Sequence, residues 1–227
     1  MKPALYISIA VILLYWVIFA ARQLLQADGP TTPSSVRDIS LYVSVKACIV
    51  FAVVWFLLRR SDETLADLGF TFDRFRSVMF DGALFAIGVF LSVNVALNTL
   101  ISTLIGAGTS SATKALFGDP QEAPFWIFTA IIGGGFAEEF LRAFVLTRFD
   151  QFFGRLGLAV AVAVDSIVFG LGHLYQGPFG GISAAFTGLM FALIFLRRRR
   201  VVDAMIAHAG FDLLGIAAAY ALYANKV

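Results

Sequence analysis

Long runs of apolar residues alternate with short polar segments along the whole chain. A helix of ~20 apolar residues crosses the hydrocarbon core of a bilayer, and seven runs approach or exceed that length. They cover residues 4–24, 39–58, 78–105, 124–147, 158–175, 179–196 and 201–224. Continuous apolar runs lack the alternation of a membrane β-barrel, and helices are the other structure that satisfies its backbone in lipid. The pattern predicts an all-α, polytopic transmembrane helix bundle with about seven spans, eight being the alternative count.

Composition strengthens this prediction. Of the 227 residues, 59% are hydrophobic and 14% are charged, whereas a soluble domain has about 25% charged residues. The chain therefore lacks the polar surface needed to face water, and its length leaves no room for a second folded unit. We expect one integral membrane domain over residues 1–227. The net charge of +2 is too small to indicate nucleic-acid binding, so the expected partners are membrane lipids and a membrane-associated peptide or protein.

The distribution of basic residues predicts the orientation. The first apolar run, from Ala4 to Ala21, exceeds the ~7–15 residues of a signal-peptide core, so we interpret it as a retained first span. With the N-terminus inside, inner segments hold eleven Lys and Arg residues and outer segments hold three. Because inner loops are enriched in these residues, the N-terminus is predicted to be cytoplasmic, in a cell inner (plasma) membrane. The run Arg197–Arg200 is interpreted as an inner-face anchor, with lipid or substrate binding as the alternative.

The fourth predicted span carries three ionisable residues in an apolar helix: Glu138, Glu139 and Arg142. One such charge at the centre of a bilayer costs about 2.5–3.5 kcal/mol on insertion scales. Arg142 follows the two glutamates by four and three positions, so it can pair with either along one helix side. A single Glu–Arg pair would be enough to join two helices. The second glutamate therefore indicates a functional cluster.

Both histidines of the chain, His173 and His208, also fall in predicted spans. A lone membrane histidine is often only an interhelical contact, but His208 shares a helix face with Asp212 at spacing i, i+4. Lipid cannot solvate these groups, so they must face the bundle interior or a wet cavity. A glutamate there could remove a proton from water while imidazole donors stabilise the oxyanion. Alternatively, Glu138, His173 and His208 could bind Zn²⁺ and activate water on it; spacing does not decide between the two.

Other residues bear on the same spans. Glycines 133–135, 170 and 172 predict close helix packing through small residues, the alternative being backbone thinned to admit an extended peptide. An ion pathway would need polar groups along the whole membrane depth. Arg22 and Lys46 are distant in sequence from the cluster, and only Asp165 and Asn94 or Asn98 could extend it. This arrangement favours a site over a channel.

Three motifs occur in order on three predicted spans: a Glu pair near an Arg, then Phe-x-x-x-His, then His-x-x-x-Asp. The second reads Phe169-Gly-Leu-Gly-His173-Leu-Tyr-Gln-Gly-Pro178. The set resembles the CPBP family, the CAAX protease and bacteriocin-processing (Abi) family of intramembrane proteases. The resemblance covers about residues 124–215. It implies an intramembrane endopeptidase acting on a membrane-associated substrate, of prenylated CAAX type or bacteriocin type.

The resemblance also implies roles for the site residues. Glu138 or Glu139 would be the base that activates water, and Arg142 would orient the glutamates. The family has three residues between the Glu pair and the Arg, whereas this chain has only Phe140 and Leu141. The Arg thus stands one helical step away, about 100°, from its expected place, and we favour Glu138 as the base.

The histidine motifs complete the implied site. His173 would assist the base, and His208 with Asp212 would stabilise the intermediate. No cofactor is required in this interpretation, with Zn²⁺ as the alternative. The alternative from another class of protein is a non-enzymatic immunity factor, scaffold or ion pathway. Straight spans would place His173 toward the outer face and His208 toward the inner one, so a shared site requires a tilt, a kink near Gly170 to Gly172 or different span boundaries.

Overall fold

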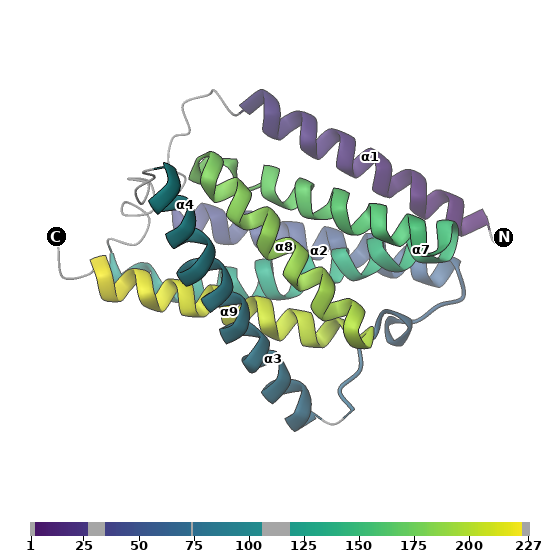
Figure 1. The fold of residues 1–227 in the computed structure, drawn as a ribbon. Helices are drawn as coiled ribbons and strands as arrows, with labels where there is room; N and C mark the ends of the chain where they lie inside the picture. Colours follow the sequence, from purple (N-terminus) through teal and green to yellow (C-terminus); the bar gives the residue numbers. More distant parts are fainter. Residues whose placement is uncertain (1–2, 27–34, 74, 106–118, 224–227) are drawn as a thin grey trace.

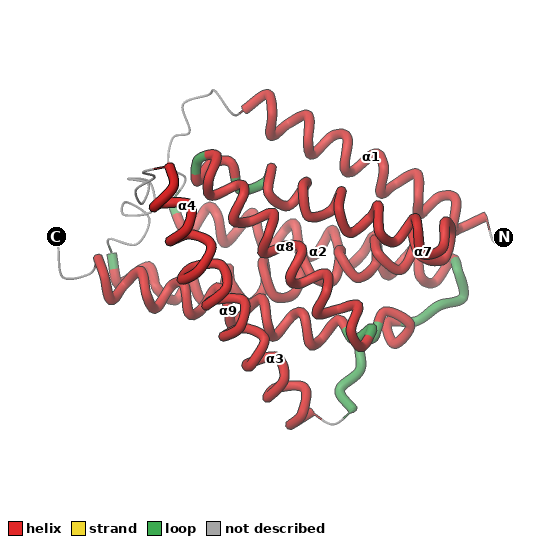
Figure 2. Tube along the Cα trace, viewed as in Figure 1, coloured by secondary structure: helices red, strands yellow, loops and turns green. Residues whose placement is uncertain are grey.

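A computed structural model describes residues 3–26, 35–73, 75–105 and 119–223. Within these ranges the chain forms helices and turns and has no β-strand (Figure 2). The helices are α1 (Pro3–Gln26), α2 (Val36–Arg60), α3 (Phe75–Phe90), α4 (Asn98–Ile105), α6 (Ala123–Thr129), α7 (Glu139–Leu171), α8 (Pro178–Arg198) and α9 (Val201–Tyr223). The all-α prediction is confirmed.

Five short helical segments connect or extend these helices. Two are π-helical, η2 (Leu91–Leu97) between α3 and α4 and η4 (Ala130–Glu138) between α6 and α7. Three are 3₁₀ turns, η1 (Leu65–Leu68), η3 (Pro120–Glu122) and η5 (Leu174–Gln176). π-Helical segments are rare and frequently lie at functional sites, which draws attention to η4 because it ends at Glu138.

Six helical segments of the described chain are long and apolar enough to cross a membrane, so the protein is a multi-pass integral membrane protein. They are Ala4–Leu25, Val36–Arg60, Phe75–Leu104, Pro120–Leu171, Pro178–Arg198 and Val201–Leu222. The count differs from seven because the predicted spans 124–147 and 158–175 both lie in the 52-residue segment Pro120–Leu171.

This long segment is folded back on itself. A straight helix of its length would measure about 78 Å, well over the ~30 Å of a hydrocarbon core. Gly154 interrupts it with φ 66° and ψ −157°, a conformation that a residue with a side chain rarely adopts. Beyond Gly154 the chain runs back along the first part of the segment. The contact between Arg142 and Asp165, on opposite sides of Gly154, shows this, since Nη1 and Oδ2 are 2.6 Å apart. Figure 1 shows the two arms side by side, so together they occupy the places of two predicted spans.

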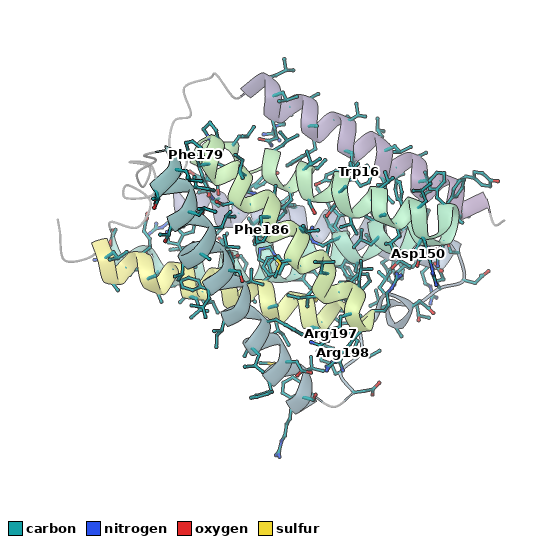
Figure 3. The ribbon with its side chains drawn as sticks, in the orientation of Figure 1. Trp16, Asp150, Phe179, Phe186, Arg197 and Arg198 are labelled. Carbon is teal, nitrogen blue, oxygen red and sulfur yellow. The ribbon has the colours of Figure 1, made fainter. Side chains whose placement is uncertain are left out.

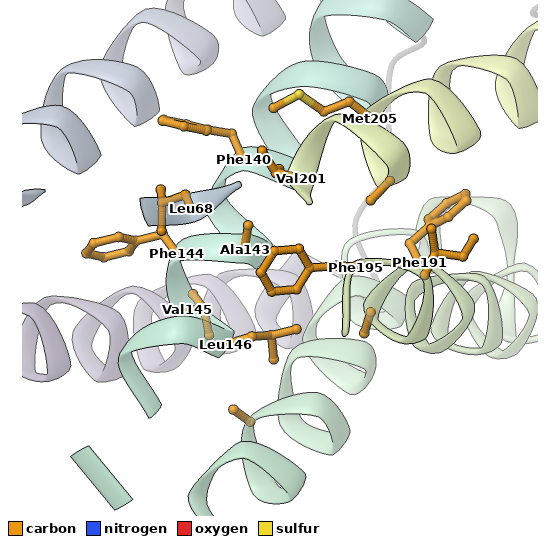
Figure 4. Packing of buried hydrophobic residues seen from close by; sticks show 14 of the residues in the cluster. Leu68, Phe140, Ala143, Phe144, Val145, Leu146, Phe191, Phe195, Val201 and Met205 are labelled. Carbon is orange, nitrogen blue, oxygen red and sulfur yellow. The ribbon is translucent and has the colours of Figure 1, made fainter. Parts of the chain in front are cut away.

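The core lies mainly between these two arms, α8 and the start of α9, and buried residues of α1, α2 and α3 complete it. Figure 4 shows aromatic and branched side chains packed between the helices. Its largest apolar members, each less than 2% exposed, include Phe140, Phe144, Leu146, Phe191 and Phe195. Large apolar side chains on the outer surface, such as Leu14 and Leu156, are exposed, as expected for helices that face lipid.

The predicted inner segments gather at one end of the bundle. Tyr6, near the start of α1, packs against Phe152 with ring centroids 5.1 Å apart. Figure 3 shows Arg197 and Arg198 at the end of α8 that lies toward Asp150, with Phe179 at the other end. The arrangement agrees with the counting of basic residues, which placed all these segments on one side.

The arginines of the run 197–200 are engaged within the protein. Arg198 pairs with Asp81 of α3. Arg199 lies 2.6 Å from Asp150, and Arg200 lies 2.9 Å from Asp203. The run thus joins α3, α7 and α9 at the turn between α8 and α9.

Candidate active site

The segment η4 holds Glu138 where three helices meet. A Cβ added to Gly133 would contact Val43 of α2, and one added to Gly135 would meet Ala209 of α9. The glycines therefore allow α2 and α9 to approach the η4 backbone closely, as the small-residue interpretation predicted. The same close approach brings side chains from both helices to the carboxylates.

Glu139 is buried and bound on two sides. Its residue is 1% exposed. Nε of Arg142 donates to both carboxylate oxygens, at 3.3 Å to Oε1 and 3.1 Å to Oε2. Nδ1 of His208 lies 2.8 Å from Oε1. Glu139 thus joins the arm of α7 that contains it to α9.

Arg142 pairs with Glu139 and has no hydrogen bond or salt bridge to Glu138, which resolves the choice that the i+3 and i+4 spacings left open. Its Nη1 also donates to Oδ2 of Asp165 at 2.6 Å and to the backbone oxygen of Gly188 at 3.1 Å. The guanidinium carbon lies 4.9 Å from the ring centroid of Phe169. Arg142 is therefore enclosed by both arms of α7 and by α8.

Glu138 has a different partner, which the sequence analysis did not place at the site. Nζ of Lys46, on α2, donates to Oε1 of Glu138 at 2.7 Å, and both side chains are 23% exposed. Oε2 of Glu138 has no hydrogen-bond partner among the residues that the structure describes. The only available signal was a lysine within an apolar span, because 92 residues separate the two positions.

Asp165, which the sequence suggested could extend the cluster, does so through Arg142. The asparagines suggested with it are arranged otherwise. Nδ2 of Asn98 donates to Asn94 at 3.3 Å, and Oδ1 of Asn98 accepts from Ser183 at 2.5 Å. These asparagines join η2 and α4 to α8 and have no hydrogen bond to the carboxylates.

His208 lies between two carboxylates. Besides its contact with Glu139, its Nε2 is 3.7 Å from Oδ2 of Asp212, which is an ion-pair distance but longer than a hydrogen bond. Phe191 of α8 stacks on the imidazole with ring centroids 4.2 Å apart. The predicted pairing of His208 with Asp212 on one helix face is thus present, with the ring held from the other side by Glu139.

Gly134 provides the space for this pair. A Cβ at that position would collide with Oδ2 of Asp212 and would lie 3.0 Å from Nε2 of His208. The backbone of η4 therefore forms one wall of the space that holds His208 and Asp212.

His173 belongs to the same region of the molecule. Helix α7 ends at Leu171, four residues before the predicted end of that span, and His173 turns back so that its Nδ1 lies 2.8 Å from the backbone oxygen of Phe169. The Phe169 ring lies 4.6 Å from the His173 ring and 5.8 Å from the His208 ring, centroid to centroid. The earlier end of α7 and this turn resolve the difference in depth that straight spans implied.

The hydrogen bond to Phe169 determines the protonation of a neutral His173. A carbonyl oxygen can only accept, so Nδ1 carries the hydrogen and Nε2 presents a lone pair. His173 therefore offers a lone pair at Nε2, and its ring packs on Phe169, which also contacts the His208 ring.

The zinc alternative requires three donors arranged around one point. Within residues 3–26, 35–73, 75–105 and 119–223, no group of three or more His, Cys, Asp or Glu side chains is arranged to hold a metal ion. The hydrogen bonds of the three candidate ligands do not decide the question, because His208, His173 and Glu138 each keep a second nitrogen or oxygen without a hydrogen bond to any described residue; what is missing is the grouping around one point. As arranged here, the candidate ligands do not fit a preformed zinc site.

The fold and the cluster together define a helical, multi-pass membrane protein with a carboxylate–imidazole centre inside its bundle. Residues 120–214 match the family model of the type II CAAX prenyl endopeptidase Rce1-like proteins. This match confirms the CPBP family resemblance predicted from the three motifs over about residues 124–215, and with it the general class of protease, a hydrolase. No curated protein and no solved structure matches the chain. The matched segment contains all six residues singled out from the sequence: Glu138, Glu139, Arg142, His173, His208 and Asp212.

Proposed function

We propose that this protein is an intramembrane endopeptidase of glutamic type, with Glu138 as the base that activates water. The observation that carries the proposal is the difference between the two adjacent carboxylates. Glu139 is enclosed and bound by Arg142 and His208. Glu138 is 23% exposed and leaves Oε2 without a hydrogen bond to any described residue. A general base must reach the proton that it removes, and Glu138 meets this requirement.

Water activation uses Glu138 and His173 together. A water at Oε2 of Glu138 would give one hydrogen to the carboxylate and could donate the other to Nε2 of His173. The water oxygen attacks the carbonyl carbon of the scissile peptide bond as its proton passes to Glu138. Collapse of the tetrahedral intermediate breaks the C–N bond, and Glu138 returns the proton to the leaving amine.

His208 and Asp212 would stabilise the oxyanion of that intermediate. A His208 ring that donates from Nδ1 to Glu139 needs a second hydrogen on Nε2 to serve the substrate, and a ring with both hydrogens is an imidazolium. The carboxylates on either side of the ring favour this charged form. A fixed, charged donor in a site shielded from bulk water suits the negative charge that develops in the transition state.

The substrate class follows from the family match and from the position of the site. We propose a membrane-associated protein with a prenylated CAAX C-terminus, because the matched family model is that of CAAX prenyl endopeptidases. Bacteriocin-type or other membrane peptides are the outcomes that a substrate panel would distinguish. The site lies within the bundle, and a lipid anchor would bring such a peptide to that depth.

The test is cleavage by the purified full-length chain in lipid nanodiscs. The panel pairs each peptide with its counterpart: a farnesylated CAAX peptide, the same peptide without the lipid, and a hydrophobic peptide lacking the motif. Glu138→Gln is the control for contaminating proteases. Cleavage of the farnesylated peptide alone supports the proposal. Cleavage only of the hydrophobic peptide that lacks the motif would show that the substrate is of another class. If wild type cleaves no peptide of the panel, the result counts against the proposed protease activity.

A further inference from the structure

We infer that Lys46 is a positioning residue for the proposed base: it holds the Glu138 carboxylate in place and keeps it ionised. This inference rests on the proposed function, since it concerns how Glu138 is made ready to accept a proton. It assigns a role to a residue outside the segment that matches the family model and on a different helix from the three motifs.

The position of Lys46 is determined by close packing of α2 on α6 and η4. Ser40 Oγ donates to the backbone oxygen of Phe125 at 3.3 Å and lies 3.1 Å from Oγ1 of Thr129. One turn further along α2, Val43 fills the space beside Gly133. Lys46 follows at the next i+3 position, so it lies on the same face of α2. Its ammonium group is thus directed at Glu138.

These contacts make a purely structural role for the Lys46–Glu138 pair unnecessary. Ser40 and Val43 already fix α2 against the segment that carries Glu138. The pair is part-buried, with both side chains 23% exposed, and a lysine within a membrane-spanning helix is costly to insert. Stability alone is therefore a weak reason for a lysine at this position.

The charges around Glu138 supply a stronger reason. The titratable and charged groups that interact with Glu138 or lie beside it come from several helices. They are Tyr15 on α1, Lys46 on α2, Glu139, Arg142 and Asp165 on α7, His173 and Tyr175 after it, and His208 and Asp212 on α9.

With Glu138 itself included, carboxylates outnumber permanent cations in this cluster by four to two. Arg142 is already bound to Glu139 and Asp165. Lys46 is thus the lysine or arginine that binds Glu138 in the described part of the chain. Like charges close together favour protonation of one of them. Without Lys46, Glu138 would have no lysine or arginine partner, and the neighbouring carboxylates would favour its protonation; a protonated glutamate cannot act as a base.

The sign of the effect on pH dependence follows. Activity requires ionised Glu138, so it falls as the pH drops and the carboxylate is protonated. An ammonium at hydrogen-bond distance favours the ionised form, which displaces this loss to lower pH. Removing Lys46 must then move the acidic limb of the kcat/KM profile to higher pH, by about 1–3 units for a close opposite charge.

The experiment measures kcat/KM from pH 5 to 10 on a cleaved peptide that has no group titrating in that range. Lys46→Met removes the charge and keeps the apolar stem, and Lys46→Arg keeps the charge. Arg37→Met is the matched control, because it removes an exposed cation from the same helix nine residues away. We expect the acidic limb to move up by at least about one pH unit in Lys46→Met. We expect it to stay in place in Lys46→Arg and Arg37→Met. Below that limb, each unit of displacement lowers the rate tenfold.

Two other outcomes are distinguishable. If Lys46→Met lowers the rate by the same factor at every pH, or leaves the profile unchanged, Lys46 does not control the ionisation of the base and the inference is wrong. If Glu138→Gln retains wild-type cleavage, the proposed function itself fails. Thermal unfolding of all variants in the same lipid shows whether a uniform loss of activity reflects a loss of folded protein.

Discussion

Nδ1 of His208 lies 2.8 Å from Oε1 of Glu139, although 69 residues separate the two positions. The contact joins the first and third motifs. It also occupies one oxygen of Glu139, a residue that the sequence alone allowed as the catalytic base. With Arg142 on the other side, Glu139 becomes part of a buried network. The neighbouring Glu138 remains the carboxylate that a water molecule could reach.

The two glutamates should therefore respond differently to the same substitution. Glu138→Gln should lower the cleavage rate by about 10²–10⁴-fold, the usual contribution of a general base. Its unfolding temperature should stay near that of wild type, because the pair is only part-buried and the glutamine oxygen can still accept from Lys46. Glu139→Gln should also impair cleavage but should unfold at lower temperature, since removing one partner of a buried ion pair costs about 3–5 kcal/mol. The measurements are cleavage rate and thermal unfolding of both variants, and the reverse pattern would assign the base to Glu139.

A substitution at Gly134 tests the geometry of His208 and Asp212 by changing the space around them and no charge. Gly134→Ala would place a methyl group against Asp212 and His208, whose side chains can shift without moving the backbone. We expect cleavage to fall about 10–100-fold, because displacing a reacting group by about 1 Å can cost 10²-fold, while the fold is retained. Gly88→Ala on α3 is the matched control, since a Cβ there meets no atom within 4 Å. Wild-type cleavage by Gly134→Ala would show that the His208–Asp212 geometry is not needed.

The sequence predicted those features that depend on local pattern. Apolar runs predicted the helices, and spacing along one helix predicted the contact of Arg142 with a glutamate and that of His208 with Asp212. The ends of spans were less certain, because hydropathy does not show that α7 folds back at Gly154 or stops at Leu171. The positions of side chains around each helix were also predicted for regular α-helices, whereas η4 is π-helical.

Contacts between segments that lie far apart in the chain could not be predicted from the sequence. Lys46 was set aside because it lay far from the motifs, yet it binds Glu138. Likewise, nothing in the spacing indicated that Glu139 would take both Arg142 and His208. A charged residue in a predicted span must have a partner or a wet surface. That rule identified Lys46 as a residue in need of a partner but could not say which one.

The membrane orientation remains a prediction that reporter fusions can check. Because basic residues favour the cytoplasmic side, fusions after residues 70, 152 and 199 should report from the cytoplasm and a fusion near residue 112 should report from outside. The structure is consistent with this grouping, since Arg148 pairs with Glu63 and Arg199 pairs with Asp150. A cytoplasmic signal at 112 would require another topology.

The last prediction separates water activated by glutamate from water activated by zinc, and it depends on His173 and His208. In the zinc alternative both rings are metal ligands, so replacing either should remove metal and activity together. In the proposed mechanism His173 accepts from water and His208 donates to the oxyanion. Loss of one oxyanion donor costs about 10²–10³-fold in rate, and this loss would occur without a change in metal content.

The measurement combines elemental analysis with cleavage assays in EDTA, for wild type, His173→Gln and His208→Gln. We expect less than stoichiometric zinc in active wild-type protein and a cleavage rate that survives the chelator, because no three His, Cys, Asp or Glu side chains of the described residues are grouped to hold a metal ion. The two variants should lose activity with their metal content unchanged. One zinc per chain, removed together with activity by EDTA and restored with it by added Zn²⁺, would overturn the glutamate mechanism.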